Sequence, residues 1–247
     1  MNLPLFSTVS PSGIYGISTS PQEFRVFITF VKIVSSAMTY PHIIFDVDGT
    51  LIDTYETYKT SLNRTAIELL GRAVTHEELS NCFGVPSNVT IDYLKFEDKA
   101  AALNMWEKYY REAAVSYSRP FKGISEMLHA LAKKAHIGIV TSRNHDEINA
   151  DPFLREHLSI FTAVIGADDS TTHKPQPGPL LAYLEKSGAK PDECVYFGDT
   201  QFDALCAQSA GIDFVLADMN CIADAGIQRM HTVHSVAEMA DFLELNK

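Results

Sequence analysis

Two aspartates lie two positions apart in the segment HIIFDVDGTLIDT, which spans residues 42–54. The apolar run before them predicts a buried strand, so Asp46 and Asp48 would follow its carboxyl end, where open α/β sheets bind their ligands. Two carboxylates this close repel each other unless a cation or a shared proton lies between them. Oxygen ligands of this kind suit Mg²⁺. The alternative interpretation is an Asp-Gly turn between the strands of a hairpin.

Three segments further along the chain would deliver polar side chains to the same edge of a sheet. The run IGIVTSR predicts a strand that ends at Thr141 and Ser142. The segment HKPQPGP places Lys174 before a predicted helix, and CVYFGDTQFD places Asp199 and then Asp203 after another strand. Because the ends of parallel strands converge on one crevice, we expect these groups to meet the aspartate pair there. A nucleophile, a proton donor, a hydroxyl, an ammonium and further metal ligands fit phosphoryl transfer.

The elements that would position these residues alternate between strand and helix after residue 121. The expected strands are 136–140, 161–165, 193–197, 214–216 and 231–233, and the expected helices are 124–134, 179–187, 202–210 and 236–245. The stretch 144–158 has Pro152 inside it and predicts an interrupted helix. Such alternation indicates a parallel sheet with helices on both faces, which is a Rossmann-like, doubly wound α/β core.

A second part of the chain carries only helical patterns. Helices are expected over 54–70, 75–82, 86–94 and 99–117, and we predict that residues 54–118 form a small all-helical cap domain. Residues 38–53 and 119–247 would then form the core domain. Residues 1–37 have no coherent pattern, and we expect them to be an upstream extension outside the core, such as one produced by a misassigned start. The alternative is an amphipathic surface strand or anchor.

Composition and charge exclude several classes of partner. The 247 residues carry a formal net charge of −11, which repels nucleic acid and anionic membranes. The four cysteines show no C-x-x-C spacing, so we expect small buried side chains in a reduced, cytoplasmic protein. His231 and His234 form an H-x-x-H pair, but no acidic or cysteine ligands next to them in the sequence complete a zinc set, and no zinc site is expected.

Taken together, the segments resemble the four motifs of the haloacid dehalogenase superfamily, in the family's order. The matching pieces are DVDGT at 46–50, Thr141 after a strand, Lys174 before Pro175, and GDTQFD at 198–203. The resemblance covers roughly residues 40–245 and combines pieces that are each weak alone. The helical insert is similar to the α-helical cap of the phosphoglycolate-phosphatase-like subgroup.

The resemblance implies a role for each matching residue. Asp46 would be the nucleophile and form an aspartyl-phosphate, while Asp48 would be the general acid and base. Thr141 would hydrogen-bond a phosphoryl oxygen, with Ser142 beside it, and Lys174 would neutralise charge. The metal ligands for Mg²⁺ would be Asp46, the backbone carbonyl of Asp48, Asp199 and, in support, Asp203. From the residues alone, Thr141 could instead cap the following helix, a role that Ser142 or Asn144 fits as well.

The expected activity is that of a Mg²⁺-dependent phosphatase acting on a small phosphorylated metabolite, phosphoglycolate-like or a sugar phosphate. A phosphosugar mutase and a pyrophosphatase of the same superfamily are the alternatives. A different class of alternative is a catalytically silent binding or regulatory module on the same fold. Substrate selection is expected from the cap, with Ser87 and Asn88 in the loop CFGVPSNVT as the candidates. We expect a monomer or a weak homodimer.

Overall fold

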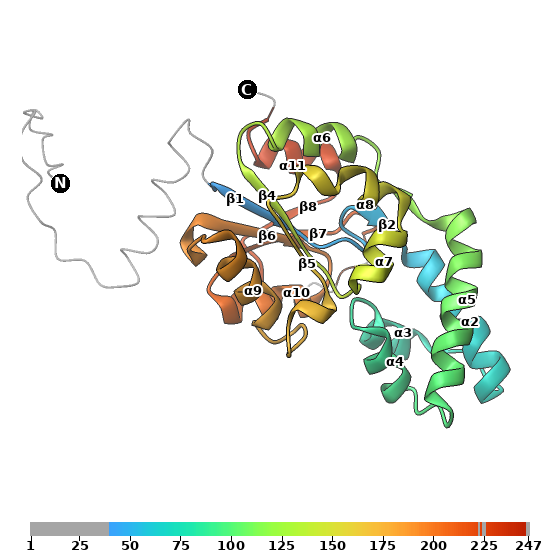
Figure 1. Ribbon diagram of the computed structural model, residues 1–247. Helices are drawn as coiled ribbons and strands as arrows, with labels where there is room; N and C mark the ends of the chain where they lie inside the picture. The colour runs from blue at the N-terminus through green and yellow to red at the C-terminus, as the bar shows by residue number, and fades with distance from the viewer. Residues whose placement is uncertain (1–39, 222, 224–225, 246–247) are drawn as a thin grey trace, which may run out of the picture. The chain divides into compact units, whose positions relative to one another are not determined.

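The computed structural model describes residues 40–221, 223 and 226–245, and Figure 1 shows their arrangement. The predicted extension over residues 1–37 lies outside this part of the chain. Among the described residues, no helix has both the length and the apolar composition needed to cross a membrane.

Six parallel strands form one sheet at the centre of the described chain. They are β1 (His42–Phe45), β4 (His136–Val140), β5 (Ala163–Ile165), β6 (Cys194–Gly198), β7 (Asp213–Ala217) and β8 (His231–Val233). Their order across the sheet is β5-β4-β1-β6-β7-β8. Strand β1 pairs with β4 on one side and β6 on the other, and all four of its residues are buried. A strand enclosed in this way must be largely apolar, which explains the sequence HIIF.

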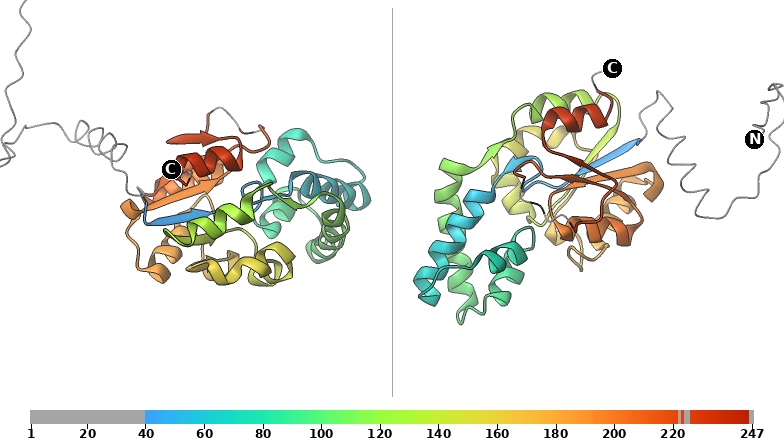
Figure 2. Two further views of the ribbon diagram at one scale, coloured as in Figure 1. Left: turned by 90° about the horizontal axis from the view of Figure 1, so that it is seen from above. Right: turned by 180° about the vertical axis from the view of Figure 1, so that it is seen from behind.

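Helices cover both faces of this sheet. Figures 1 and 2 show α6 (Ile124–Leu131) and α11 (Val236–Phe242) on one face, and α9 (Gly178–Ser187) and α10 (Gln201–Ala210) on the other. The second pair buries Leu180, Tyr183 and Cys206 in the same apolar cluster as Ile44 and Tyr196 of the strands. The predicted α/β fold with a parallel sheet is therefore confirmed.

Four helices between the first two motifs have an apolar core of their own. They are α2 (Tyr55–Leu70), α3 (His76–Cys82), α4 (Ser87–Tyr93) and α5 (Lys99–Tyr117). The Tyr58 ring lies edge-on to Phe83 and Trp106, at 5.1 and 5.4 Å between ring centroids. Aromatic pairs in this geometry add to the stabilisation from buried area. In Figure 1 these helices lie beside one end of the sheet, with α2 and α5 alongside each other.

A short antiparallel ladder joins the helical segment to the rest of the chain. Strand β2 (Ile52–Asp53) pairs with β3 (Arg119–Pro120), so the chain leaves and re-enters at adjacent points. Two-residue strands are too short to show an alternating pattern, and the sequence analysis assigned no strand there. The ladder lies where the core and cap domains were predicted to meet, and those domain boundaries stay a prediction.

The structure agrees with the expected interruption of one helix, adds short elements and corrects one expectation about burial. The interrupted helix over 144–158 is two helices, α7 (His145–Ala150) and α8 (Pro152–His157), with Asp151 capping the second. The described part of the chain also has three single turns of 3₁₀-helix, at Leu158–Ile160, Ala167–Asp169 and Pro191–Glu193. The expectation that all cysteines are buried is wrong for Cys221, which is exposed, whereas Cys82, Cys194 and Cys206 are buried.

Candidate active site

Asp46, Thr141 and Asp199 each follow the carboxyl end of one of three neighbouring strands, β1, β4 and β6. Backbone hydrogen bonds extend the ladders to these positions: the Asp46 N–H donates to Phe197 O at 2.8 Å, and the Thr141 N–H donates to Ile165 O at 3.0 Å. The central strands of the sheet therefore bring these three side chains to one edge.

Lys174 lies buried between two carboxylates of this edge. Its Nζ donates to Asp46 Oδ1 at 2.9 Å and to Asp203 Oδ1 at 2.7 Å. Burial alone would lower the pKa of Lys174, but the two negative charges raise it above its ordinary value, so the side chain is an ammonium. A buried charge is tolerated only when it is paired and hydrogen-bonded, and Lys174 meets both conditions.

Asp203 accepts hydrogen bonds from Tyr196 and Thr200 as well as from Lys174. Its Oδ1 also accepts from Tyr196 Oη at 2.7 Å, and its Oδ2 accepts from Thr200 Oγ1 at 2.6 Å and Thr200 N at 3.1 Å. Burial would raise the pKa of Asp203, yet Lys174 and these donors hold it below its usual range. Asp203 is thus a fixed anion that orients Lys174, and it caps α10 as well.

Three carboxylates at this edge are arranged as a cation site. Single oxygens of Asp46, Asp199 and Asp203 all lie within 4.8 Å of one another. Among the residues that the structure describes, Asp199 Oδ1 is a buried oxygen without a hydrogen-bond partner. Burial and the charges of Asp203 and Asp46 raise the pKa of Asp199 well above its usual value. A divalent cation would remove this repulsion, and an all-oxygen donor set suits Mg²⁺.

The loop after β1 is shaped for close approach to Asp199. Gly49 has a φ of +79°, and a Cβ at this position would lie 2.0 Å from Asp199 Oδ2. Only glycine can take this backbone conformation and leave room for the carboxylate. The glycine of the DVDGT motif is therefore explained by the position of Asp199.

Asp48 is not one of the three clustered carboxylates and is held by Arg143. Its oxygens accept from Arg143 Nε at 2.8 Å and from Arg143 Nη2 at 2.7 Å, and Arg143 Nη1 donates to Asp151 Oδ2 at 2.9 Å. Tyr110 Oη of α5 lies 3.5 Å from Asp48 Oδ1. Burial would raise the pKa of Asp48, but the Arg143 guanidinium holds it below its ordinary value. Asp48 is therefore a carboxylate in this arrangement.

The two hydroxyl residues after β4 have different surroundings. Thr141 is buried, and its Oγ1 accepts from the backbone N–H of Arg143 at 3.2 Å. Ser142 Oγ donates across to Gly84 O, in the turn before α4, at 3.0 Å. The cap of α7 is Asn144, so neither Thr141 nor Ser142 has that role.

Gly84 itself lies against the loop that carries Asp199. Its φ is +85°, and a Cβ there would lie 2.7 Å from Thr200 Cγ2. The turn before α4 thus contacts both the loop after β4 and the loop after β6, so the helical segment lies directly beside the carboxylate group.

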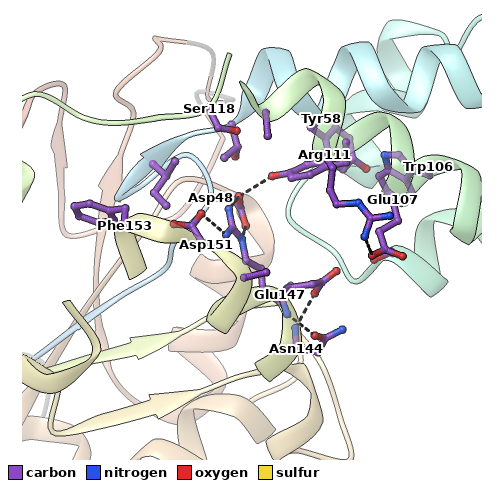
Figure 3. Close-up of a pocket in the computed structure, with 18 of the residues that line it drawn as sticks. Asp48, Tyr58, Trp106, Glu107, Arg111, Ser118, Asn144, Glu147, Asp151 and Phe153 are labelled. Carbon is purple, nitrogen blue, oxygen red and sulfur yellow. Dashed lines mark hydrogen bonds and ion pairs between the residues drawn. The ribbon is translucent and has the colours of Figure 1, made fainter. Parts of the chain in front are cut away.

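A cavity of about 1010 Å³ opens next to Asp48, between the helical segment and the α7–α8 region. Figure 3 shows Asp48 and Asp151 on one side of it, with Tyr58, Trp106 and Arg111 facing them. This volume is at the upper end of what small-molecule sites enclose. Of the two cap residues predicted to select substrate, Ser87 lines the cavity, whereas Asn88 is exposed on α4 and is absent from the described residues that line it.

The sequence analysis assigned no role to Asp151, Tyr110 or Tyr196. Arg143 stands next to two motif residues, so its position gave a signal that its charge could be used there. Asp151 and the two tyrosines reach the site from positions that have no motif spacing, and only the packing of α5, α8 and β6 reveals them.

Asp218, Cys221 and His234 form another cluster of side chains of the types that bind metals. His234 Nδ1 is 3.7 Å from Asp218 Oδ2 and 3.9 Å from Cys221 Sγ, whereas the His231 ring stacks on Phe242. The two histidines therefore do not act as a pair. Asp218 and Cys221 approach His234 through the fold rather than through adjacent sequence, and whether they hold a metal stays untested.

Comparison with known proteins identifies the family of this chain. The model of the haloacid dehalogenase-like hydrolase family matches residues 43–217, and the chain belongs to that family. A phosphoglycolate phosphatase of Agrobacterium fabrum is 32% identical over 183 residues, which are 70% of this chain and 78% of that protein. Pyrophosphatase PpaX of Bacillus velezensis is 28% identical over 68% of this chain and 79% of its own length.

The structure agrees with solved members of the same fold. The crystal structure of β-phosphoglucomutase from Clostridium difficile superimposes with a TM-score of 0.67, at 18% identity, over 83% of this chain and 97% of that one. The predicted membership of the superfamily, and the expectation of an enzyme of the phosphatase type, are therefore confirmed.

Proposed function

We propose that this protein is a Mg²⁺-dependent phosphatase that hydrolyses a small phosphate monoester through an aspartyl-phosphate on Asp46. The observation that carries the proposal is the buried Asp46 carboxylate, held by Lys174 at 2.9 Å and lying next to Asp199. Orientation of a nucleophile before the reaction removes much of the entropic barrier to attack.

In the first step a carboxylate oxygen of Asp46 forms a bond to phosphorus while the bond from phosphorus to the ester oxygen breaks. Asp48, which enters this step as a carboxylic acid after its carboxyl group has left Arg143, donates its proton to that leaving oxygen and becomes a carboxylate. In the second step Asp48 takes a proton from water, which attacks the phosphoryl group and restores Asp46. Thr141 donates a hydrogen bond to a phosphoryl oxygen, and Lys174 balances the charge that builds up on it.

The carboxylates of Asp46 and Asp199 and the backbone carbonyl of Asp48 would hold Mg²⁺, with Asp203 in support. The metal supplies positive charge that screens the phosphoryl oxygens from the carboxylates. The unpartnered Asp199 Oδ1 and the mutual proximity of the three carboxylates support this donor set. Without a bound cation, the three carboxylates would repel each other and the phosphate group of a substrate.

The names of the relatives bear on the leaving group of the substrate. The relatives named phosphoglycolate phosphatase and pyrophosphatase support a small anionic leaving group over a sugar. A pyrophosphatase activity is therefore the second candidate. The phosphosugar mutase alternative has support only in fold similarity, which does not determine substrate. The intact set of aspartates and Lys174 argues against a silent binding module.

The proposal is tested by measuring inorganic phosphate released from 4-nitrophenyl phosphate, 2-phosphoglycolate, pyrophosphate and glucose 1-phosphate. Each substrate is measured with Mg²⁺ and with EDTA. We expect Mg²⁺-dependent hydrolysis of at least the aryl ester and one natural ester. Conversion of glucose 1-phosphate to glucose 6-phosphate without phosphate release would support the mutase instead. Absence of any reaction would contradict the proposal.

We further infer a cytoplasmic protein that works as a monomer or weak homodimer. Free, buried Cys82, Cys194 and Cys206 support a reducing compartment. Sedimentation of the purified protein across a range of concentrations tests the oligomeric state, and a stable tetramer would contradict the inference.

A further inference from the structure

Arg143 is the most strongly paired cation that faces the cavity. Two of its nitrogens bind both oxygens of Asp48, and the third binds Asp151. Its side chain is 11% exposed, against 23% for Asp48 and 16% for Asp151. A planar guanidinium matches a carboxylate through two parallel hydrogen bonds, which makes this contact geometrically specific.

This pairing conflicts with the role of Asp48 in the proposed function. Both oxygens of Asp48 are used by Arg143, so the carboxyl group must leave Arg143 before it can reach an ester oxygen beside Asp46. Arg143 then keeps Asp151 and loses two of its three charge-assisted bonds. A largely buried charge that loses a partner is costly unless another anion takes the vacated place.

We propose that a second anionic group of the substrate, in addition to the phosphate that reacts, replaces the Asp48 carboxylate on Arg143. The favoured substrates would be small phosphate compounds whose leaving group carries a carboxylate or a phosphate close to the leaving oxygen. That group replaces Asp48 on Arg143 and so frees Asp48 to act on the same substrate. The inference rests on the proposed function and names the class of leaving group that the site selects.

The other charges around the cavity point to Arg143 as the place for this anion. Arg111 is exposed and paired with Glu107 at 2.8 Å, and Arg119 Nη2 donates to Val115 O of α5 at 2.8 Å. Asp146 and Glu147 also line the cavity and make it unfavourable for an anion that has no paired cation, and the charge of Glu147 also acts on Asp48 and Arg143. Of these described cations, Arg143 is the one that Asp48 would leave without a partner, so an anionic leaving group is favoured there and a neutral one gains nothing from displacing Asp48.

Three phosphate esters of nearly equal size test the effect of the leaving group's charge separately from the effect of its shape. They are 2-phosphoglycolate, 2-hydroxyethyl phosphate and 2-aminoethyl phosphate, whose leaving groups carry a negative, zero and positive charge. The readout is the ratio of kcat/KM for the anionic ester to that for the neutral ester. For the wild type we expect a ratio of about ten or more, and a still lower kcat/KM for the cationic ester.

Two variants change this ratio in opposite directions. Arg143→Met removes the guanidinium, and the ratio should fall to about one. Asp151→Asn keeps the cap of α8 but removes a carboxylate that competes for Arg143, and the ratio should rise severalfold. Arg72→Met is the matched control, because Arg72 also binds a carboxylate through two bonds, to Glu78, but on the surface outside the cavity. It should leave the ratio unchanged.

A purely structural role for Arg143, as a holder of Asp48, would slow all three esters equally and leave the ratio intact, which would overturn the inference. A wild-type ratio near one, or a ratio that falls in Asp151→Asn, would do the same even if Arg143→Met does not fold. Hydrolysis of 4-nitrophenyl phosphate distinguishes failure of the inference from failure of the proposed function. If the wild type hydrolyses this ester with Mg²⁺ but shows no charge preference among the three esters, only the inference fails. If no ester is hydrolysed, the proposed function fails as well.

Discussion

Lys174 Nζ lies 2.9 Å from Asp46 Oδ1, and both side chains are almost completely withdrawn from solvent. The same ammonium binds Asp203, so one cation orients the proposed nucleophile and is itself oriented by a second carboxylate. With Asp199 included, three carboxylates and one ammonium leave two negative charges, which one divalent cation balances. The pairing of Lys174 with Asp46 is thus part of both the catalytic geometry and the charge balance.

Lys174→Met should destabilise the metal-free protein strongly. The change leaves Asp46 and Asp203 buried without their cation, and breaking a buried pair in this way costs about 3–5 kcal/mol. Urea unfolding in EDTA measures the change in the free energy of unfolding. The control is Lys59→Met, which breaks an exposed pair with Glu56 and should cost no more than about 1 kcal/mol. Similar losses in the two variants would show that the Lys174 pairs contribute little.

Mg²⁺ should raise the melting temperature of the protein, because it binds the folded carboxylate group and not the unfolded chain. At a Mg²⁺ concentration of about one hundred times Kd the gain is about 2.7 kcal/mol, or roughly 5–10 °C for a domain of this size. Asp199→Asn should reduce this shift and, without metal, should melt no lower than wild type, because it removes a carboxyl group whose ionisation is opposed by burial and by the charges of Asp203 and Asp46. A large metal-free destabilisation by Asp199→Asn would contradict this description of the site.

The stability of the metal-free protein should decrease as the pH rises from about 5 to 7.5. Burial raises the pKa of Asp46 to about 7, whereas an aspartate in the unfolded chain titrates near 3.9. The folded state therefore holds a proton that the unfolded state has lost, and stability falls as the pH rises through this window. Asp199, whose pKa is also raised, acts in the same direction. Thermal melts in EDTA check the trend, and saturating Mg²⁺ should flatten it.

Asp48→Asn should affect phosphate esters according to their leaving groups. Attack by Asp46 survives, but an alkoxide then lacks its proton donor, a loss of about 10²–10⁴ in rate. In single-turnover phosphorylation, 4-nitrophenyl phosphate should lose much less than 2-phosphoglycolate, because its leaving group needs little protonation. Equal losses for both esters would count against an acid role for Asp48.

Ser87→Ala should change the ranking of substrates and leave Mg²⁺ affinity nearly unaltered. Ser87 lines the cavity on the side formed by the helical segment, and Asp46, Asp199 and Asp203 are not among the described residues that line it. Relative kcat/KM values across the ester panel, with a Mg²⁺ titration, test this expectation. Ser80→Ala is the matched control, since Ser80 lies on α3 and donates to His76 O. If metal affinity collapses while the ranking stays fixed, the helical segment does not select the substrate.

The sequence predicted the parts of the fold that have long, regular signals. The apolar run before Asp46 and the alternation of strands and helices were sufficient for the parallel sheet, because buried parallel strands are nearly uniformly apolar. The β2–β3 ladder was missed, since two residues carry no period. Cys221 was predicted to be buried but is exposed, because composition alone does not show which side of a loop faces solvent.

The candidate site was predictable only where it coincides with motifs. Asp46, Lys174 and Asp199 follow predicted strands or precede a predicted helix, so their convergence could be argued from topology. The ion pair between Arg143 and Asp48 could not be argued from topology. It depends on the direction of one long side chain and on Asp151, which lies at a break between two helices. Contacts of this kind are determined by tertiary packing, which spacing does not encode.

The most direct test of the proposed chemistry is to stop the reaction with acid during turnover and map phosphorylated peptides by mass spectrometry. With 2-phosphoglycolate and Mg²⁺, we predict one phosphoryl group on the Asp46 side chain, absent when EDTA replaces Mg²⁺. Asp46→Asn should give no phosphorylated peptide and no phosphate release. Steady hydrolysis without phosphorylation of Asp46, or a phosphoryl group on another residue, would contradict the role of Asp46 as the nucleophile.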